Sequence, residues 1–162
     1  MLNDTDFLRI IEATPLVSVD LIVRNEKGEA LLGHRRNRPA QGFWFVPGGR
    51  IRKNERVADA LERIARHELG VRLAGPRLVG VFDHVYEDNF LGTSGVNTHY
   101  VVLGFEAELA AGIPFTPDDQ HSAWQWWPVG ILLENSGVHE NTKAYFRVPA
   151  PDGLGIKTPP GR

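Results

Sequence analysis

The chain has 162 residues, of which 42% are hydrophobic and 23% are charged, and this is enough for one globular domain with a sizeable core. The formal net charge of −2 gives no strong positive field that would favour nucleic acid or an anionic membrane as a partner. Because cysteine is absent, disulfide bonds and thiol catalysis are excluded. No apolar run reaches membrane-spanning length and no signal-peptide pattern begins the chain, so we expect a cytoplasmic protein.

Hydrophobic periodicity predicts the elements of the first part of the chain. They are a helix over residues 4–13 capped by Asn3 or Asp4, a strand over 16–23, a turn over 25–28 and a strand over 30–33. The strand over 16–23 is a dense apolar run, which is typical of a strand covered on both faces. Asp20 interrupts it, and a buried carboxylate needs a partner. Two interpretations stay open for Asp20, namely a structurally paired carboxylate at a strand edge or a contact with a ligand.

A basic segment follows, with three arginines in the four residues 35–38. The planar guanidinium fork of arginine suits phosphate oxygens. The segment lies just before the glycines of Pro47-Gly48-Gly49-Arg50, whose turned backbone can approach a ligand closely. Binding of a phosphate is therefore favoured over a solvated loop, and Arg50 joins the candidates.

One helix is predicted after this glycine loop. Asn54 is a suitable N-cap, and Gly70 stands where a left-handed residue ends a helix. The apolar face contains Leu61 and Ile64 at helical spacing. Glu68 lies near the negative end of the helix dipole, where a carboxylate needs a positive charge beside it.

Hydrophobic patterns and turn residues predict the elements of the second part of the chain. They are strands over 78–85 and 98–109 with a loop over 86–95 between them, a short tryptophan-rich strand before Pro128, and helices over 129–135 and 139–147. Gln120 and His121 precede the tryptophan-rich strand. An amide oxygen can bind Mg²⁺ and a histidine can take a proton from water, although a solvated loop is the alternative. We expect one domain over 1–148 and a flexible tail rich in proline and glycine over 149–162.

The segment 49–71 resembles the signature of the Nudix hydrolases, G-x5-E-x7-R-E-U-x-E-E-x-G-U. The matching residues are Gly49, Glu55, Arg63, Glu68, Gly70 and Val71. Ile64 and His67 stand where the signature has glutamates. The GDP-mannose mannosyl hydrolase subfamily is known for such losses, and the stretches that begin at Thr14, Asn37, Thr98 and Pro117 are similar to it. The resemblance implies an α/β fold, the Nudix α/β/α sandwich with a mixed β-sheet between helices.

The resemblance also implies roles for individual residues. It implies one Mg²⁺ per active site, with Mn²⁺ as a substitute, held by the Gly48 carbonyl, Glu68 and Gln120. It implies His121 as the general base, with Arg35, Arg50 and Tyr100 stabilising a departing diphosphate. The implied substrate contacts are Leu2, Asp6, Phe7, Asp20, Arg35, Arg50, His84 and Tyr100, with Arg38 as a weaker phosphate candidate. The implied structural residues of the signature are Gly49, Glu55, Arg63 and Gly70.

The implied activity is the hydrolysis of GDP-mannose, with GDP-glucose as a further candidate, to GDP and free sugar. Water would attack the anomeric carbon with inversion. Two alternatives stay open, a nucleotide-sugar pyrophosphatase that gives GMP and sugar 1-phosphate, and a catalytically weak nucleotide-binding module. The resemblance further implies a homodimer that has a GDP-sugar as its substrate and neither nucleic acid nor a membrane as its partner.

Overall fold

The computed structural model describes residues 2–109, 112 and 120–147. Its strands are β1 (Leu16–Arg24), β2 (Ala30–Arg35), β3 (Trp44–Phe45), β4 (Gly48–Arg50), β5 (Arg77–Tyr86), β6 (Thr98–Glu108) and β7 (His121–Trp127). Its helices are α1 (Asp4–Ala13), α2 (Val57–Ile64), the π-helical η1 (Ala65–Leu69), α3 (Val129–Glu134) and α4 (Glu140–Arg147). In the part of the chain described here, no helix is long and apolar enough to cross a membrane. The predicted tail over 149–162 lies outside the described residues.

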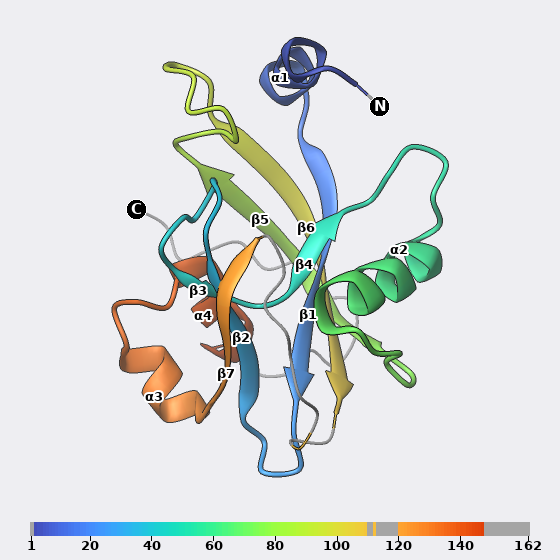
Figure 1. Cartoon of the computed structure of the whole chain (residues 1–162), viewed down its shortest axis with the longest axis vertical. Coiled ribbons are helices and arrows are strands. Elements are labelled where there is room, and N and C mark those ends of the chain that lie inside the picture. The colour runs from blue at the N-terminus through green and yellow to red at the C-terminus, as the bar shows by residue number, and fades with distance from the viewer. Residues whose placement is uncertain (1, 110–111, 113–119, 148–162) are drawn as a thin grey trace.

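The seven strands form one mixed sheet in the order β3-β2-β1-β6-β5, with β4 paired to β1 and β7 paired to β2 (Figure 1). The pair β1–β6 is parallel, whereas β5–β6, β1–β4 and β2–β7 are antiparallel. The central strand β1 is buried along most of its length, as its dense apolar sequence predicts. Asp20 therefore lies inside a central strand of the sheet, and the interpretation that placed it at a strand edge is wrong.

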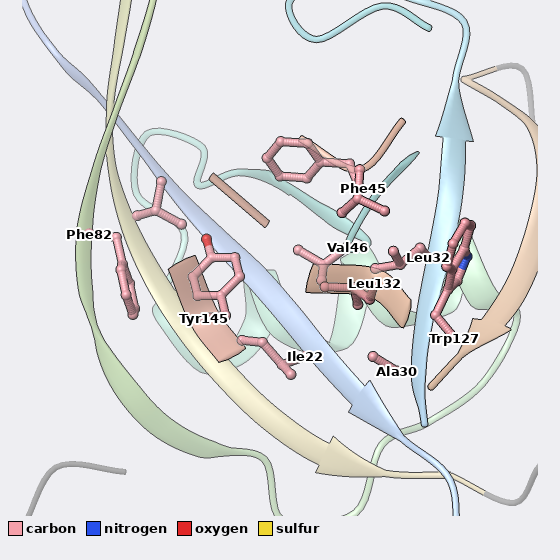
Figure 2. Close-up of a cluster of buried hydrophobic side chains, with 11 residues drawn as sticks. Ile22, Ala30, Leu32, Phe45, Val46, Phe82, Trp127, Leu132 and Tyr145 are labelled. Carbon is pink, nitrogen blue, oxygen red and sulfur yellow. The ribbon is translucent and has the colours of Figure 1, made fainter. Parts of the chain in front are cut away.

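Alternation along β1 divides the core into two clusters, one on each face of the sheet. Val19, Leu21 and Val23 pack with α2 and η1 in one cluster. Ile22 lies in the other cluster with residues of α3 and α4, including Leu132 and Tyr145 (Figure 2). Helices thus cover both faces of a mixed sheet, and the predicted α/β/α sandwich is confirmed.

The segment between β4 and η1 differs from its prediction in two places. Asn54 has a φ of 65°, so it occupies a left-handed turn, and the N-cap of α2 is Arg56, which makes no side-chain capping bond. The predicted single helix is divided into α2 and the π-helical η1. At its end, Gly70 takes the expected left-handed conformation with a φ of 69°.

The first helix stands at one end of the sheet, beside the loop that joins β5 to β6 (Figure 1). Its predicted cap is present, because the Asn3 side chain accepts a hydrogen bond from the backbone N–H of Asp6 at 2.9 Å. The rings of Phe7 and Phe90 lie 5.0 Å apart and connect the helix to the loop. This contact places α1 over one end of the cleft described next.

Candidate functional site

A cleft opens where the ends of β1, β4, β5 and β6 meet α1 and the loop after β2. It gathers predicted substrate residues from separate parts of the chain, namely Phe7, Asp20, Arg35, Arg50, His84 and Tyr100. A side pocket continues from it along the end of the signature helix and contains Glu68 and His67. Gly48, Arg50 and Gln120 line both the cleft and the side pocket. The sheet therefore brings the arginine, glycine and glutamine segments of the sequence to one place.

The segment between β4 and α2 is fastened to the helix by an ion pair. Arg63 donates from Nε and Nη2 to the two Glu55 carboxylate oxygens at 2.6 and 2.8 Å. The same guanidinium donates to the carbonyl of Arg50 at 2.9 Å. Glu55 also accepts from the backbone N–H of Arg52 at 2.8 Å. The hydrogen bonds from Arg63, first, and from Arg52 lower the pKa of Glu55 to about 2, so this carboxylate stays ionised.

The side pocket offers oxygen ligands for one metal ion. Glu68 is only 6% exposed, and its carboxylate accepts from the backbone N–H of Gly48 at 3.2 Å. Gln120 adds an amide oxygen, and Gly48 adds a carbonyl to the same pocket. Among the described residues, no group of three or more histidine, aspartate or glutamate side chains could hold a metal ion. In the part of the chain that the structure describes, one carboxylate with neutral oxygens beside it fits a Mg²⁺ that keeps several waters.

The two positions that lack the signature acids differ in their surroundings. Ile64 is 2% exposed, belongs to the core cluster on the α2 face, and lies within 3.2 Å of the position a Cβ would take on Gly49. His67 is exposed and lines the side pocket. Both positions line the side pocket, but position 64 also packs in the core, whereas position 67 is exposed.

Asp20 forms a polar contact with α4 under the floor of the cleft. Its Oδ2 accepts from the hydroxyl of Tyr145 at 2.6 Å, and that hydroxyl lies 3.3 Å from Nε2 of His84. Burial raises the pKa of Asp20 to about 7, although the Tyr145 hydrogen bond and the charge of Arg35 oppose the rise. Burial, followed by repulsion from His139, lowers the pKa of His84 to about 3. His84 is therefore neutral at physiological pH.

The backbone of Gly48 passes directly beside Asp20. The two residues are partners in the β1–β4 ladder, and a Cβ on Gly48 would lie 2.3 Å from Oδ1 of Asp20. Only glycine allows this approach. Asp20 thus has one oxygen bound to Tyr145 and the other against the backbone that leads to the side pocket.

The cationic groups of the cleft lie around its opening. Arg50 stacks on the ring of Phe7, with its guanidinium carbon 4.1 Å from the ring centroid. Arg35 donates from Nε to the carbonyl of Pro39 at 3.0 Å. Arg38 is paired with Asp88 at 3.1 Å. Burial raises the pKa of Tyr100, which keeps its phenol protonated as a hydrogen-bond donor.

Three predicted site residues lie away from the cleft walls. Leu2 is exposed, and the Asp6 carboxylate accepts one hydrogen bond from the Asn3 side chain and contributes nothing to the lining. His121 is 1% exposed at the start of β7, with its ring centroid 4.5 Å from that of Trp124. Its Cδ2 fills the space beside Gly33, where an added Cβ would lie 2.5 Å away. In this conformation His121 is a packing residue.

Two cleft-side residues were missed by the sequence reasoning. Phe90 follows a polar stretch of the β5–β6 loop, and its pairing with Phe7 depends on where α1 docks. Tyr145 lies on α4, 125 residues from its partner Asp20. No spacing pattern could have connected Tyr145 with Asp20.

The family model described as "NUDIX domain" matches residues 14–148 of this chain. The chain belongs to the Nudix family. It is a Nudix hydrolase, and enzymes of this family generally use a divalent metal such as Mg²⁺ on nucleotide-derived substrates.

Two curated relatives and one solved structure are similar to this Nudix hydrolase. The low-salt glycan biosynthesis protein Agl8 of Haloferax volcanii is 45% identical over 107 residues, which are 65% of this chain and 67% of that protein. The uncharacterized Nudix hydrolase YvcI of Bacillus subtilis is 37% identical over 95 residues, which are 59% of this chain and 57% of that protein. The MutT protein of Methanosarcina mazei superposes with a TM-score of 0.69 at 21% identity, covering 83% of this chain and 93% of that one, and this likeness shows the fold.

Proposed function

We propose that this Nudix hydrolase splits a GDP-sugar, GDP-mannose or GDP-glucose, into GDP and the free sugar with one Mg²⁺ per active site. Water attacks the anomeric carbon, the C–O bond to the diphosphate breaks, and the configuration inverts. The observation that carries the proposal is the single carboxylate, Glu68, in a side pocket that opens onto a cleft with Arg35 and Arg50.

The loss of two signature acids, together with the arginines that line the cleft, favours attack at carbon over attack at phosphorus. Nudix enzymes that attack phosphorus use several signature carboxylates to hold metals and activate water, and Ile64 and His67 replace two of these acids here. What remains is suited to neutralising a departing diphosphate: Arg35, Arg50, and Tyr100 as a phenol donor. Gly48, Glu68 and Gln120 would hold the Mg²⁺, which would supply further positive charge to stabilise the departing diphosphate. These groups make the diphosphate a good leaving group.

The remaining walls offer contacts for the two ends of the substrate. Phe7 and Phe90 form an aromatic pair at the α1 end, which suits a purine base. Asp20 and His84 line the floor, where a carboxylate and a neutral imidazole can bind sugar hydroxyls. The name of the Haloferax relative, a glycan biosynthesis protein, supports a sugar-bearing substrate.

We assign the role of general base to His121, next to the metal-side Gln120. Because its ring is buried in the present conformation, this role requires the ring to turn from Trp124 into the cleft when substrate binds. His121→Leu should then lower kcat by about 100-fold or more and leave the affinity for GDP nearly unchanged. A fall in melting temperature with kcat within about tenfold would instead identify His121 as a packing residue.

Gln120 has a test of its own. Gln120→Ala should weaken the apparent affinity for Mg²⁺, because it removes one oxygen ligand, while a saturating metal concentration restores most of the turnover. The measurement is kcat as a function of Mg²⁺ concentration. An unchanged dependence would remove Gln120 from the metal shell.

Product analysis in H₂¹⁸O with Mg²⁺ tests the reaction itself. GDP with ¹⁸O in the mannose supports attack at carbon. GMP with mannose 1-phosphate, and the label in a phosphate, would establish a pyrophosphatase and overturn the proposal. Binding of GDP without turnover of any GDP-sugar would establish a binding module.

The proposal includes a homodimer and a cytoplasmic location, both implied by the family resemblance and the composition. Light scattering coupled to gel filtration tests the dimer. Cell fractionation tests the location.

A further inference from the structure

We propose that Tyr145 of α4 is a positioning residue that orients Asp20 and His84 toward the sugar of the substrate. The inference rests on the proposed function, because it concerns the sugar end of the same cleft. Its basis is a buried polar chain that joins α4 to two strands of the sheet. Tyr145 itself does not line the cleft, so it acts through the two residues that do.

The ring of Tyr145 is held firmly by apolar packing. It belongs to the core cluster that contains Ile22 and Phe82, and its centroid lies 4.7 Å from that of Phe82 in an edge-to-face arrangement (Figure 2). It also lies against Gly104 of β6, where an added Cβ would be 3.2 Å from the ring. The hydroxyl of such a fixed ring defines one position for its hydrogen-bond partners.

The lengths of its two contacts indicate whether the Tyr145 hydroxyl donates or accepts in each of them. The distance to Oδ2 of Asp20 is 2.6 Å, which is typical of an O–H donor and a carboxylate, so Tyr145 donates to Asp20 when Asp20 is ionised, above its pKa of about 7. The longer contact, 3.3 Å to Nε2 of His84, then requires the hydroxyl oxygen to accept. A neutral His84 can supply this proton only if Nε2 carries it. The chain therefore runs from His84 through Tyr145 to Asp20.

The direction of these hydrogen bonds determines which atoms of His84 and Asp20 can accept a hydrogen bond from a ligand. With Nε2 protonated, the other ring nitrogen of His84 is an acceptor. Oδ1 of Asp20 lies beside the backbone of Gly48, and both residues line the cleft. Two acceptors at fixed positions on the cleft floor match the O–H donors of a sugar. Arg35 and Arg50, which we propose bind the diphosphate, make no hydrogen bond to His84, Tyr145 or Asp20 in the described part of the protein.

The variant Tyr145→Phe removes one oxygen and retains the ring. We expect it to lower kcat/KM for the GDP-sugar by about tenfold or more, because Asp20 and His84 lose their fixed orientation. The inhibition constant of GDP should stay within about twofold, because GDP lacks the sugar. Equal losses of affinity for GDP and for the GDP-sugar, or an unchanged kcat/KM, would overturn the proposal.

Two controls separate positioning from simple loss of stability. Phe146→Leu perturbs the same helix at a ring that stacks on Arg24, away from the cleft, and should lower the melting temperature without changing KM. In an Asp20→Asn background, Tyr145→Phe should cost much less than it does alone, since the two residues act together. Additive losses would contradict the polar chain.

A measurement on the unmodified protein tests the chain without a variant or turnover. In ¹⁵N-histidine NMR spectra, His84 should be the neutral Nε2–H tautomer from about pH 8 to 9, where Asp20 is ionised. A protonated Nδ1, or a titration within that range, would overturn the inference. Because this result does not depend on the reaction, it distinguishes failure of the inference from failure of the proposed function.

Discussion

The two halves of the signature segment serve different purposes and have diverged to different extents. In the first half, Glu55 and Arg63 form a complete set of hydrogen bonds that includes the carbonyl of Arg50. In the second half, Glu68 is the one acid that remains, beside a buried Ile64 and an exposed His67. The half that shapes the loop is intact, whereas the half that collects metals is reduced.

This difference indicates that the shape of the loop does not depend on how many acidic side chains stand at the end of the helix. Arg63 holds the loop in place by hydrogen bonds that need no metal. Gly49 and Ile64 pack together where an acid would face the metal, so the loss at position 64 adds apolar contact in the core. The loop can therefore keep Arg50 and Gly48 in position for a reaction that uses fewer charges.

Glu68→Gln gives the largest expected effect. Turnover should fall at least about 100-fold, because the single charged metal ligand is lost. The melting temperature should change little, since glutamine can still accept from the Gly48 N–H. Steady-state kinetics with Mg²⁺ measure the effect, and His67→Gln in the same pocket is the matched control. Equal activity of the two variants would remove the metal site from the mechanism.

Restoring the missing acids one at a time sharpens the comparison. Ile64→Glu should lower the free energy of unfolding by about 3 kcal/mol or more, because it buries a carboxyl group in the core. His67→Glu should change it by less than about 0.5 kcal/mol, because that position is exposed. Calorimetry should show tighter Mg²⁺ binding in His67→Glu, which adds a carboxylate to the side pocket without burying it in the core. Similar stabilities in urea denaturation would show that position 64 is not a packing position.

Sequence reasoning succeeded where local pattern decides the structure. The apolar run of β1, the Asn3 cap and the left-handed Gly70 follow from residue types and short spacing. The choice of Asn54 as a cap failed because the Arg63 hydrogen bonds determine how the loop enters α2, and this leaves Asn54 in a left-handed turn.

The contacts of the polar groups under the cleft could be identified only from the tertiary structure. The contact of Tyr145 with Asp20 depends on the docking of α4 on the sheet. The burial of His121 depends on the close approach of β7 to Gly33. Neither can be obtained from spacing, because the packing of one element on another sets the environment of the side chain.

Arg63→Ala breaks the intact half of the segment. It removes three hydrogen bonds and leaves the Glu55 carboxylate with the Arg52 N–H but without its cation, so unfolding should become easier by about 2 kcal/mol. Arg66→Ala is the control, because its ion pair with Glu62 is exposed and should contribute little to stability. Urea denaturation compares them, and equal effects would mean that the loop does not depend on Arg63.

The pH dependence of stability gives the smallest expected effect and concerns the floor of the cleft. The pKa of His84 is about 3 in the folded protein and 6.5 in the unfolded chain, so the unfolded chain binds the proton more readily. The contribution of neutral His84 is complete above pH 6.5 and is lost as the pH falls toward 3. Between pH 7 and pH 5 the loss should be about 1 to 2 kcal/mol.

Other groups near His84 titrate in the same range, so a difference measurement is needed. His139, with a lowered pKa, acts in the same direction, whereas the raised pKa of Asp20 acts in the opposite one. Comparing the pH profiles of wild type and His84→Phe by urea denaturation isolates the His84 contribution. The variant should lose less stability than wild type between pH 7 and pH 5. Parallel profiles would mean that His84 is protonated at little cost, and the polar chain under the cleft would then lack its donor.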